Sequence, residues 1–177
     1  MRERVRELGG TLRLNSGTSG TRVEVTVPLG KDTMSKRILV VDDHDVVRQG
    51  IRLILRGHPE WQVVAEAEDG FEAVEKTRSF DPDLVILDIS MPRKGGLEVI
   101  RELAKLGIRS KILVLTMHDS QELMAEVRKS SASGYVVKTH AARDLVRAVR
   151  QIFDGGTSFP LQPPSPVKSP PEPITPR

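Results

Sequence analysis

Short aliphatic runs alternate with segments of helical periodicity from about Arg37 to residue 156. The runs are continuous and do not alternate with polar residues, which indicates strands that are buried on both faces, as in a parallel sheet. Five strands are predicted, at residues 37–42, 61–67, 83–88, 111–116 and 134–138.

The segments between and after these strands repeat apolar residues near the spacing i, i+3, i+4, i+7 and predict amphipathic helices. Five helices are expected, at residues 45–57, 70–80, 96–107, 120–131 and 142–156. Because the crossover connections of such β-α repeats are right-handed, the helices should cover both faces of one sheet. The predicted fold class is therefore α/β, a doubly wound (βα)5 sandwich.

The two ends of the chain depart from this pattern. Residues 1–29 predict a short helix at 2–8 followed by a β-hairpin, and residues 30–36 form a polar linker. Eight of the 12 prolines fall in the last 18 residues, so residues 157–177 are expected to be a disordered tail. The β-α domain itself is predicted to span residues 37–156.

Composition narrows the function classes. The chain has 177 residues, no cysteine and 3% aromatic residues, which excludes disulfide scaffolds, thiol catalysis and cysteine-based zinc sites and argues against base-stacking surfaces. The absence of an 18-residue apolar run and of a signal peptide predicts a cytoplasmic protein without membrane contact. The chain has a net charge of +3, but residues 37–155 carry 18 basic and 19 acidic groups, so the positive excess comes from the two ends of the chain. Charge therefore supports nucleic-acid binding only weakly.

Polar residues end four of the five predicted strands. Asp42 and Asp43 close the first, Asp88 the third, Thr116 the fourth and Lys138 the fifth. Ligands of open α/β sheets bind beyond the carboxyl ends of the strands, so these groups should share one rim. Clustered carboxylates favour a hard cation such as Mg²⁺, and a lysine and a hydroxyl can hold a phosphoryl group. The predicted chemistry is magnesium-dependent phosphoryl transfer onto an aspartate.

Taken singly, each residue has an ordinary structural alternative. Asp42 and Asp43 could cap the following helix, and Asp45 is assigned mainly to that N-cap role. Asp88 alone would fit a turn, and Lys138 alone a solvated charge. The prediction depends on their joint occurrence at successive strand ends.

Four motifs, ILVVDDHDVVRQGI, DLVILDISMP, ILVLT and GYVVK, resemble the receiver domain of two-component response regulators across residues 37–156. The DDH opening, the LTMHD segment and the last helix, ARDLVRAVRQIFDGG, resemble the subfamily usually joined to a LuxR-type helix-turn-helix. The resemblance implies a flavodoxin-like sheet with strand order 2-1-3-4-5. It also implies that a sensor histidine kinase donates the phosphoryl group from a phosphohistidine.

By this resemblance, Asp88 is the phosphoacceptor. Asp42 and Asp43 would hold Mg²⁺ together with the Asp88 carboxylate and the backbone carbonyl of Ser90. Phosphorylation would then remodel the face formed by the fourth helix, the fifth strand and the fifth helix of the domain.

The resemblance also assigns the remaining site residues. Thr116 would hydrogen-bond one phosphoryl oxygen and Lys138 would pair with another, while Tyr135 would be the aromatic switch that turns inward with Thr116. Ser90 and His118 occupy the two positions that tune the lifetime of the phosphoryl group. An exposed loop position without such a role is the alternative for His118.

Residues 1–29 resemble the end of the ATP-binding domain of a sensor histidine kinase. Segments for adenine and Mg²⁺ are missing from them, so we expect no ATP-dependent kinase activity, and a piece of a hybrid kinase is one interpretation. The proline-rich stretch after Phe159 offers no recognition helix, so DNA binding by this chain is not expected. The downstream partner is left open, and a homodimer is one option.

Two other function classes remain open at this point. A haloacid-dehalogenase-type phosphatase would use the D-x-D-x-V motif at residues 43–47. It would lack a downstream acidic pair and leave Asp88 without a role. A pseudo-receiver that only docks to a partner is the other alternative.

Overall fold

The computed structural model describes residues 11–17, 20–26, 35–117 and 120–160. The chain divides into two units, Met1–Met34 and Ser35–Arg177. In the first unit, β1 (Thr11–Gly17) and β2 (Gly20–Thr26) pair antiparallel, which confirms the predicted hairpin. The strands extend into the expected turn as far as Gly17 and Gly20, and the helix predicted at 2–8 lies outside the described residues.

The second unit contains one parallel sheet of five strands in the order β4-β3-β5-β6-β7. This order confirms the fold class and the 2-1-3-4-5 arrangement predicted from the sequence. The strands are β3 (Lys36–Val41), β4 (Trp61–Ala67), β5 (Leu84–Asp88), β6 (Lys111–Thr116) and β7 (Gly134–Val137).

All five helices predicted in this unit are present, with ends that differ from the predicted ones by up to three residues. They are α2 (Asp45–Leu55), α3 (Gly70–Phe80), α4 (Gly96–Lys105), α5 (Gln121–Lys129) and α6 (Ala141–Phe153). A 3-10 turn, η1 (Lys138–His140), connects β7 to α6. None of the helices that the structure describes is long and apolar enough to cross a bilayer.

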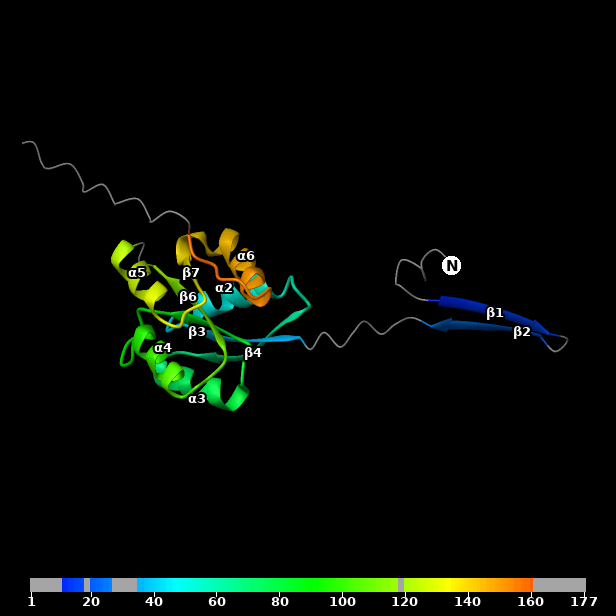
Figure 1. Cartoon of the computed structure of the whole chain (residues 1–177), viewed down its shortest axis with the longest axis horizontal. Coiled ribbons are helices and arrows are strands. Elements are labelled where there is room, and N and C mark those ends of the chain that lie inside the picture. The colour runs from blue at the N-terminus through cyan, green and yellow to red at the C-terminus, as the bar shows by residue number, and fades with distance from the viewer. Residues whose placement is uncertain (1–10, 18–19, 27–34, 118–119, 161–177) are drawn as a thin grey trace, which may run out of the picture. The chain divides into compact units, whose positions relative to one another are not determined.

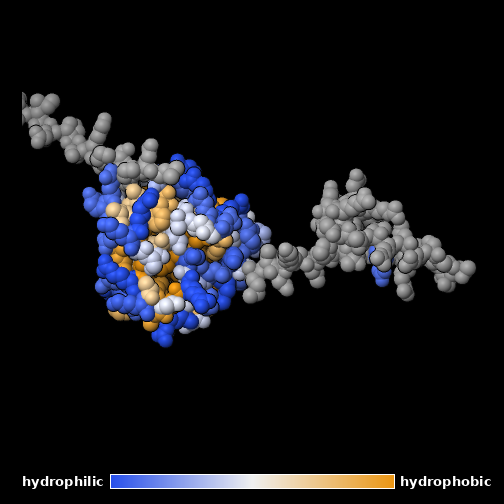
Figure 2. All heavy atoms as spheres, in the orientation of Figure 1, coloured by the Kyte–Doolittle hydropathy of each residue, from blue (hydrophilic) through white to orange (hydrophobic). Residues whose placement is uncertain are grey.

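Two hydrophobic cores lie on opposite faces of the sheet. Figure 1 shows helices on both sides of the sheet. Ile38 and Val40 of β3 pack with α2 and α6, whereas Leu39 and Val41 pack with α3, α4 and α5. Successive side chains of a strand point to opposite faces, so an unbroken aliphatic run supplies both cores. Hydrophilic residues surround hydrophobic ones on the face of this unit shown in Figure 2. Because helices pack on both of its faces, the sheet supports the residues at its carboxyl edge.

Candidate functional site

The carboxyl ends of four strands bring the predicted site residues to one rim. Asp42 directly follows β3, and Asp88 and Thr116 are the last residues of β5 and β6. Asp88 pairs with Leu115, the residue before Thr116. Thr116 pairs with Val137, the residue before Lys138. The strand register therefore places these side chains next to one another, as the sequence predicts.

Lys138 connects two buried carboxylates. Its Nζ lies 2.6 Å from Asp42 Oδ2 and 2.8 Å from Asp88 Oδ2. All three side chains are buried, with exposed fractions of 7%, 0% and 2%. Burial alone would lower the pKa of the Lys138 ammonium, but hydrogen bonds and charge attraction to Asp42 and Asp88 outweigh burial and raise it. Lys138 is therefore a cation between the two carboxylates at neutral pH.

Asp43 and His44 extend the acidic site toward the solvent. His44 Nδ1 lies 2.8 Å from Asp43 Oδ1, and the His44 backbone N–H donates to Asp42 Oδ1 at 3.0 Å. The ligand atoms of Asp42, Asp43 and His44 lie within 4.8 Å of one another. The sequence reasoning missed His44 as a member of the site, although its position directly after the two aspartates was the available signal.

The loop after Asp88 is held close to β5. The backbone N–H of Ser90 donates to Asp88 Oδ1 at 3.2 Å, and that of Gly96 donates to the Ile89 carbonyl at 3.0 Å. A Cβ at residue 96 would lie 2.3 Å from the Asp88 carbonyl oxygen, which only glycine avoids. The first turn of α4 thus packs directly against the end of β5 and fixes the backbone of Asp88.

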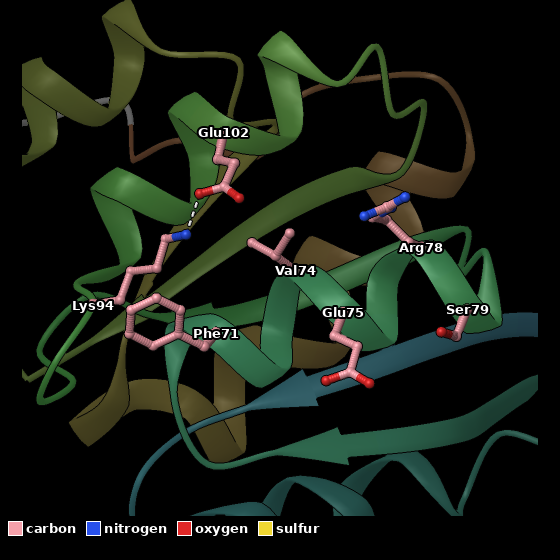
Figure 3. A pocket seen from close by; sticks show the side chains of 7 residues that line it. All are labelled: Phe71, Val74, Glu75, Arg78, Ser79, Lys94 and Glu102. Carbon is pink, nitrogen blue, oxygen red and sulfur yellow. Dashed lines mark hydrogen bonds and ion pairs between the residues drawn. The ribbon is translucent and has the colours of Figure 1, made fainter.

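Two ion pairs hold the same loop to the neighbouring helices. Arg93 pairs with Asp69, the residue that caps α3, and Lys94 pairs with Glu102 of α4. Lys94 and Glu102 also line an open pocket of about 410 Å³ between α3 and α4, with Phe71 beside Lys94 (Figure 3). None of the predicted site residues lines this pocket. The pocket therefore lies beside the Lys94–Glu102 ion pair that holds the loop and is separate from the carboxylate rim.

The two predicted switch residues are buried. Thr116 is fully buried, and the Tyr135 side chain is 2% exposed within the core on the α3, α4 and α5 face. Tyr135 is thus a core residue on that face, and its switching role stays a prediction. His118 lies outside the described residues, so its lifetime-tuning role stays a prediction.

The N-cap assignment of Asp45 is wrong. His44 is the N-cap of α2, and Asp45 is the first residue of the helix. The Asp45 carboxylate binds Arg48 at 3.1 Å and Gln49 at 2.6 Å, which are neighbours one helical turn away. The His44 side chain makes no hydrogen bond to the backbone N–H groups at the start of α2, and its Nδ1 lies against Asp43 instead.

Comparison with known proteins identifies the family. The profile described as "Response regulator receiver domain" matches residues 38–150, more than half of the chain. The chain belongs to this family. The receiver assignment agrees with the rim of Asp42, Asp88, Thr116 and Lys138, and the phosphatase and docking-module alternatives are not favoured.

Relatives of this receiver are themselves response regulators. It is 40% identical to the transcriptional regulatory protein DegU of Brevibacillus brevis over 120 residues, 68% of this chain and 51% of DegU. It is 42% identical to the response regulator UvrY of Escherichia coli K12 over 118 residues, 67% of this chain and 54% of UvrY. The chain spans about half the length of these curated relatives.

A solved structure agrees with the same assignment. The two-component response regulator of the LuxR family from Aurantimonas sp. SI85-9A1 matches with a TM-score of 0.66 and 37% identity, covering 69% of this chain and 87% of that one. The receiver is thus similar in fold and sequence to LuxR-family regulators, as the DDH and LTMHD motifs predict.

Proposed function

We propose that this receiver accepts a phosphoryl group on Asp88 from a phosphohistidine of a sensor histidine kinase. The observation that supports this most directly is the buried Asp88 carboxylate, which Lys138 holds at the carboxyl rim beside Asp42. An Asp88 carboxylate oxygen attacks phosphorus and forms a P–O bond, while the P–N bond breaks and its electron pair leaves with the imidazole. Positioning and neutralisation of charge supply most of the catalysis in such transfers.

The charges of the rim fit a divalent cation. Asp42, Asp43 and Asp88 carry three negative charges and Lys138 one positive charge, which leaves an excess of two. Asp42 Oδ2 and Asp43 Oδ1 are buried, and within the described residues they face the Lys138 ammonium at 2.6 Å and the His44 imidazole at 2.8 Å. We propose that Asp42, Asp43, Asp88 and the Ser90 carbonyl hold Mg²⁺, a cation that prefers such oxygen ligands. Bound Mg²⁺ would neutralise charge on the phosphoryl oxygens during transfer.

The other two strand ends complete the proposed site. Lys138 would exchange one of its two carboxylate partners for a phosphoryl oxygen, and the Thr116 hydroxyl would donate to another. Phosphorylation adds about −1.5 to −2 charges at neutral pH, which strengthens both interactions. Because Thr116 and Tyr135 lie on the adjacent strands β6 and β7, the change would reach the α5–β7–α6 face.

Beryllofluoride binding tests this proposal because BeF₃⁻ mimics an aspartyl phosphate. We expect wild-type protein to bind BeF₃⁻ with one-to-one stoichiometry in isothermal titration calorimetry when Mg²⁺ is present. Chelation of Mg²⁺ should abolish the binding, because the extra negative charge would then lie among three carboxylates without compensation. Binding that is equally strong without a divalent cation would contradict the proposed metal site.

The exposed side of α2 is the proposed docking surface for the kinase. Val46 and Leu53 are 81% and 69% exposed, and Gln49 and Gly50 lie between them on the same side of the helix. These residues line a shallow hollow on the surface of α2. Val47, the next residue along α2, instead packs against the core that includes α6.

Replacing both Val46 and Leu53 with alanine should slow phosphoryl transfer from a histidine kinase by at least about tenfold. Complete burial of a valine or leucine side chain contributes about 1.5–3 kcal/mol relative to leaving it exposed. The rate is measured with the kinase that transfers fastest to the wild-type protein, and labelling by the small donor phosphoramidate should not change. Leu106→Ala, a 48% exposed leucine at the end of α4, is the matched control. Equal transfer rates for wild type and the double variant would rule out this surface.

Several predictions from the sequence belong to the same proposal. The division into residues 1–29, 30–36, 37–156 and 157–177, the cytoplasmic location, the absence of DNA binding and a possible homodimer all stay predictions. Of the predicted tail, residues 157–160 are described, and Ser158 pairs with Gly134. The likeness of residues 1–29 to the end of a histidine kinase ATP-binding domain is not supported by the comparisons, since the matching family profile covers residues 38–150.

A further inference from the structure

The segment after α6 returns along the free edge of β7. The Ser158 backbone N–H donates to the Ser133 carbonyl at 2.9 Å, and the Tyr135 N–H donates to the Ser158 carbonyl at 2.8 Å. Ser158 thereby forms a parallel bridge with Gly134. We call residues 157–160 the C-terminal strap. These residues were assigned to the tail from the sequence, and the structure packs them on the domain.

Gly134 permits this close approach. A Cβ at residue 134 would lie 2.8 Å from the Ser158 carbonyl oxygen, closer than side chains tolerate. An unpaired edge strand exposes backbone N–H and C=O groups to other chains, and the strap satisfies those of β7 at this point. The backbone of the strap is therefore fitted to the strand that carries Tyr135.

Side chains connect the strap to both helices that flank β7. The Arg128 guanidinium of α5 lies 4.9 Å from the centre of the Phe159 ring and donates to the Pro160 carbonyl at 2.6 Å. Phe159 packs against the core that contains Tyr135 and Val127. On the other side, the Ser158 hydroxyl donates to Gln151 of α6 at 2.8 Å. One short segment thus contacts α5, β7 and α6 together.

We propose that the C-terminal strap stabilises the conformation in which Tyr135 is buried and is thereby coupled to the occupancy of Asp88. The argument starts from β7, whose N-terminal half binds the strap and whose C-terminal end leads directly into Lys138, the partner of Asp88. Tyr135 donates its backbone N–H to the strap while its side chain lies in the core. Loosening the strap therefore frees the segment that holds Tyr135 in place.

The direction of the coupling rests on the proposed function together with the predicted switch role of Tyr135, in which Tyr135 turns inward with Thr116 on phosphorylation. A strap that favours the inward position favours the same state as the phosphoryl group does. Coupling between two sites is reciprocal, so removing the strap contacts should weaken binding of a phosphoryl mimic at Asp88. Coupling free energies of this kind commonly change affinity by about 5- to 150-fold.

The test uses the full chain with Arg128→Ala and, separately, Phe159→Ala. Arg128 lies on the surface, so its replacement should not prevent folding. Hydrogen–deuterium exchange measured by NMR should show faster exchange of the Tyr135 amide in both variants without BeF₃⁻. Calorimetry in Mg²⁺ should show BeF₃⁻ affinity lowered by about five- to tenfold, the lower part of the range for coupled sites. Lys129→Ala, which removes the neighbouring exposed charge of the same turn, should change neither.

The outcomes separate the strap from the proposed phosphorylation. Unchanged exchange of the Tyr135 amide in both variants would show that the strap does not hold β7 in place. Faster exchange with unchanged BeF₃⁻ affinity would overturn the coupling to Asp88. A wild-type protein that binds no BeF₃⁻ in Mg²⁺ would overturn the proposed function, and with it the coupling, whereas the exchange experiment would still decide whether the strap holds β7.

Discussion

Asp88→Asn abolishes phosphorylation of this protein if Asp88 is the acceptor. An amide oxygen is a poor nucleophile and cannot form the acyl phosphate, whereas its carbonyl still accepts a hydrogen bond from Lys138. Phosphoramidate is a suitable donor because its P–N bond resembles that of phosphohistidine. Intact-mass spectrometry in Mg²⁺ should show one added phosphoryl group on the wild type and none on the variant.

The control for this experiment is Asp154→Asn, at an exposed carboxylate that follows α6. It should be labelled as fast as the wild type. Thermal unfolding should show that Asp88→Asn is still folded, since the substitution removes one of three mutually repelling carboxylates and keeps the size of the side chain. A folded Asp88→Asn variant that still gains a phosphoryl group would place the acceptor elsewhere and reject the proposed function.

The sheet and its rim could be predicted because both depend on local patterns. Continuous aliphatic runs indicate strands buried on both faces, and the last residue of each run marks the edge where ligands bind. Once the strand order is known, the register brings Asp88, Thr116 and Lys138 together. Predicting which polar residues lie at this edge therefore required only the assignment of a parallel sheet.

Orientation of neighbouring residues could not be predicted in the same way. Asp42 and Asp43 are equivalent in the sequence, yet Asp42 is fully buried and binds Lys138, whereas Asp43 is 25% exposed and binds His44. Successive side chains at the end of a strand point in different directions, and the sequence does not say which points inward. The adjacent residues Val46 and Val47 pose the same problem on α2, where only the second packs against the core.

The C-terminal strap was missed for another reason. Proline dominates the sequence from Pro160 onward, so Ser158 and Phe159 were grouped with the tail. Their backbone pairing with β7 and their packing on α5 involve residues more than twenty positions earlier in the chain. No local periodicity indicates such an edge pairing, although Gly134 at the start of a buried strand was a sign of close backbone approach.

Lys138→Met should lower the free energy of unfolding by about 3–5 kcal/mol, the usual effect of removing one partner from a buried charged group. The variant leaves Asp42 and Asp88, which are 0% and 2% exposed, without the ammonium that lies within 2.8 Å of both. Urea unfolding measured by circular dichroism without Mg²⁺ gives the difference. Lys129→Met, at an exposed position of α5, should be within about 0.5 kcal/mol of the wild type.

Two further measurements separate charge from packing at Lys138. Adding Asp42→Asn to Lys138→Met should restore part of the lost stability, because one buried carboxylate is then removed as well.

The raised pKa of Lys138 gives the expected pH dependence of its contribution to stability. Its stabilisation is fully present below the unfolded-state pKa of about 10.4 and is lost as the pH rises through the higher folded-state pKa. The difference between wild type and Lys138→Met should therefore stay constant between about pH 6 and 9 and narrow only above about pH 10.4. A difference that disappears near neutral pH would show that Lys138 does not hold these carboxylates as a cation.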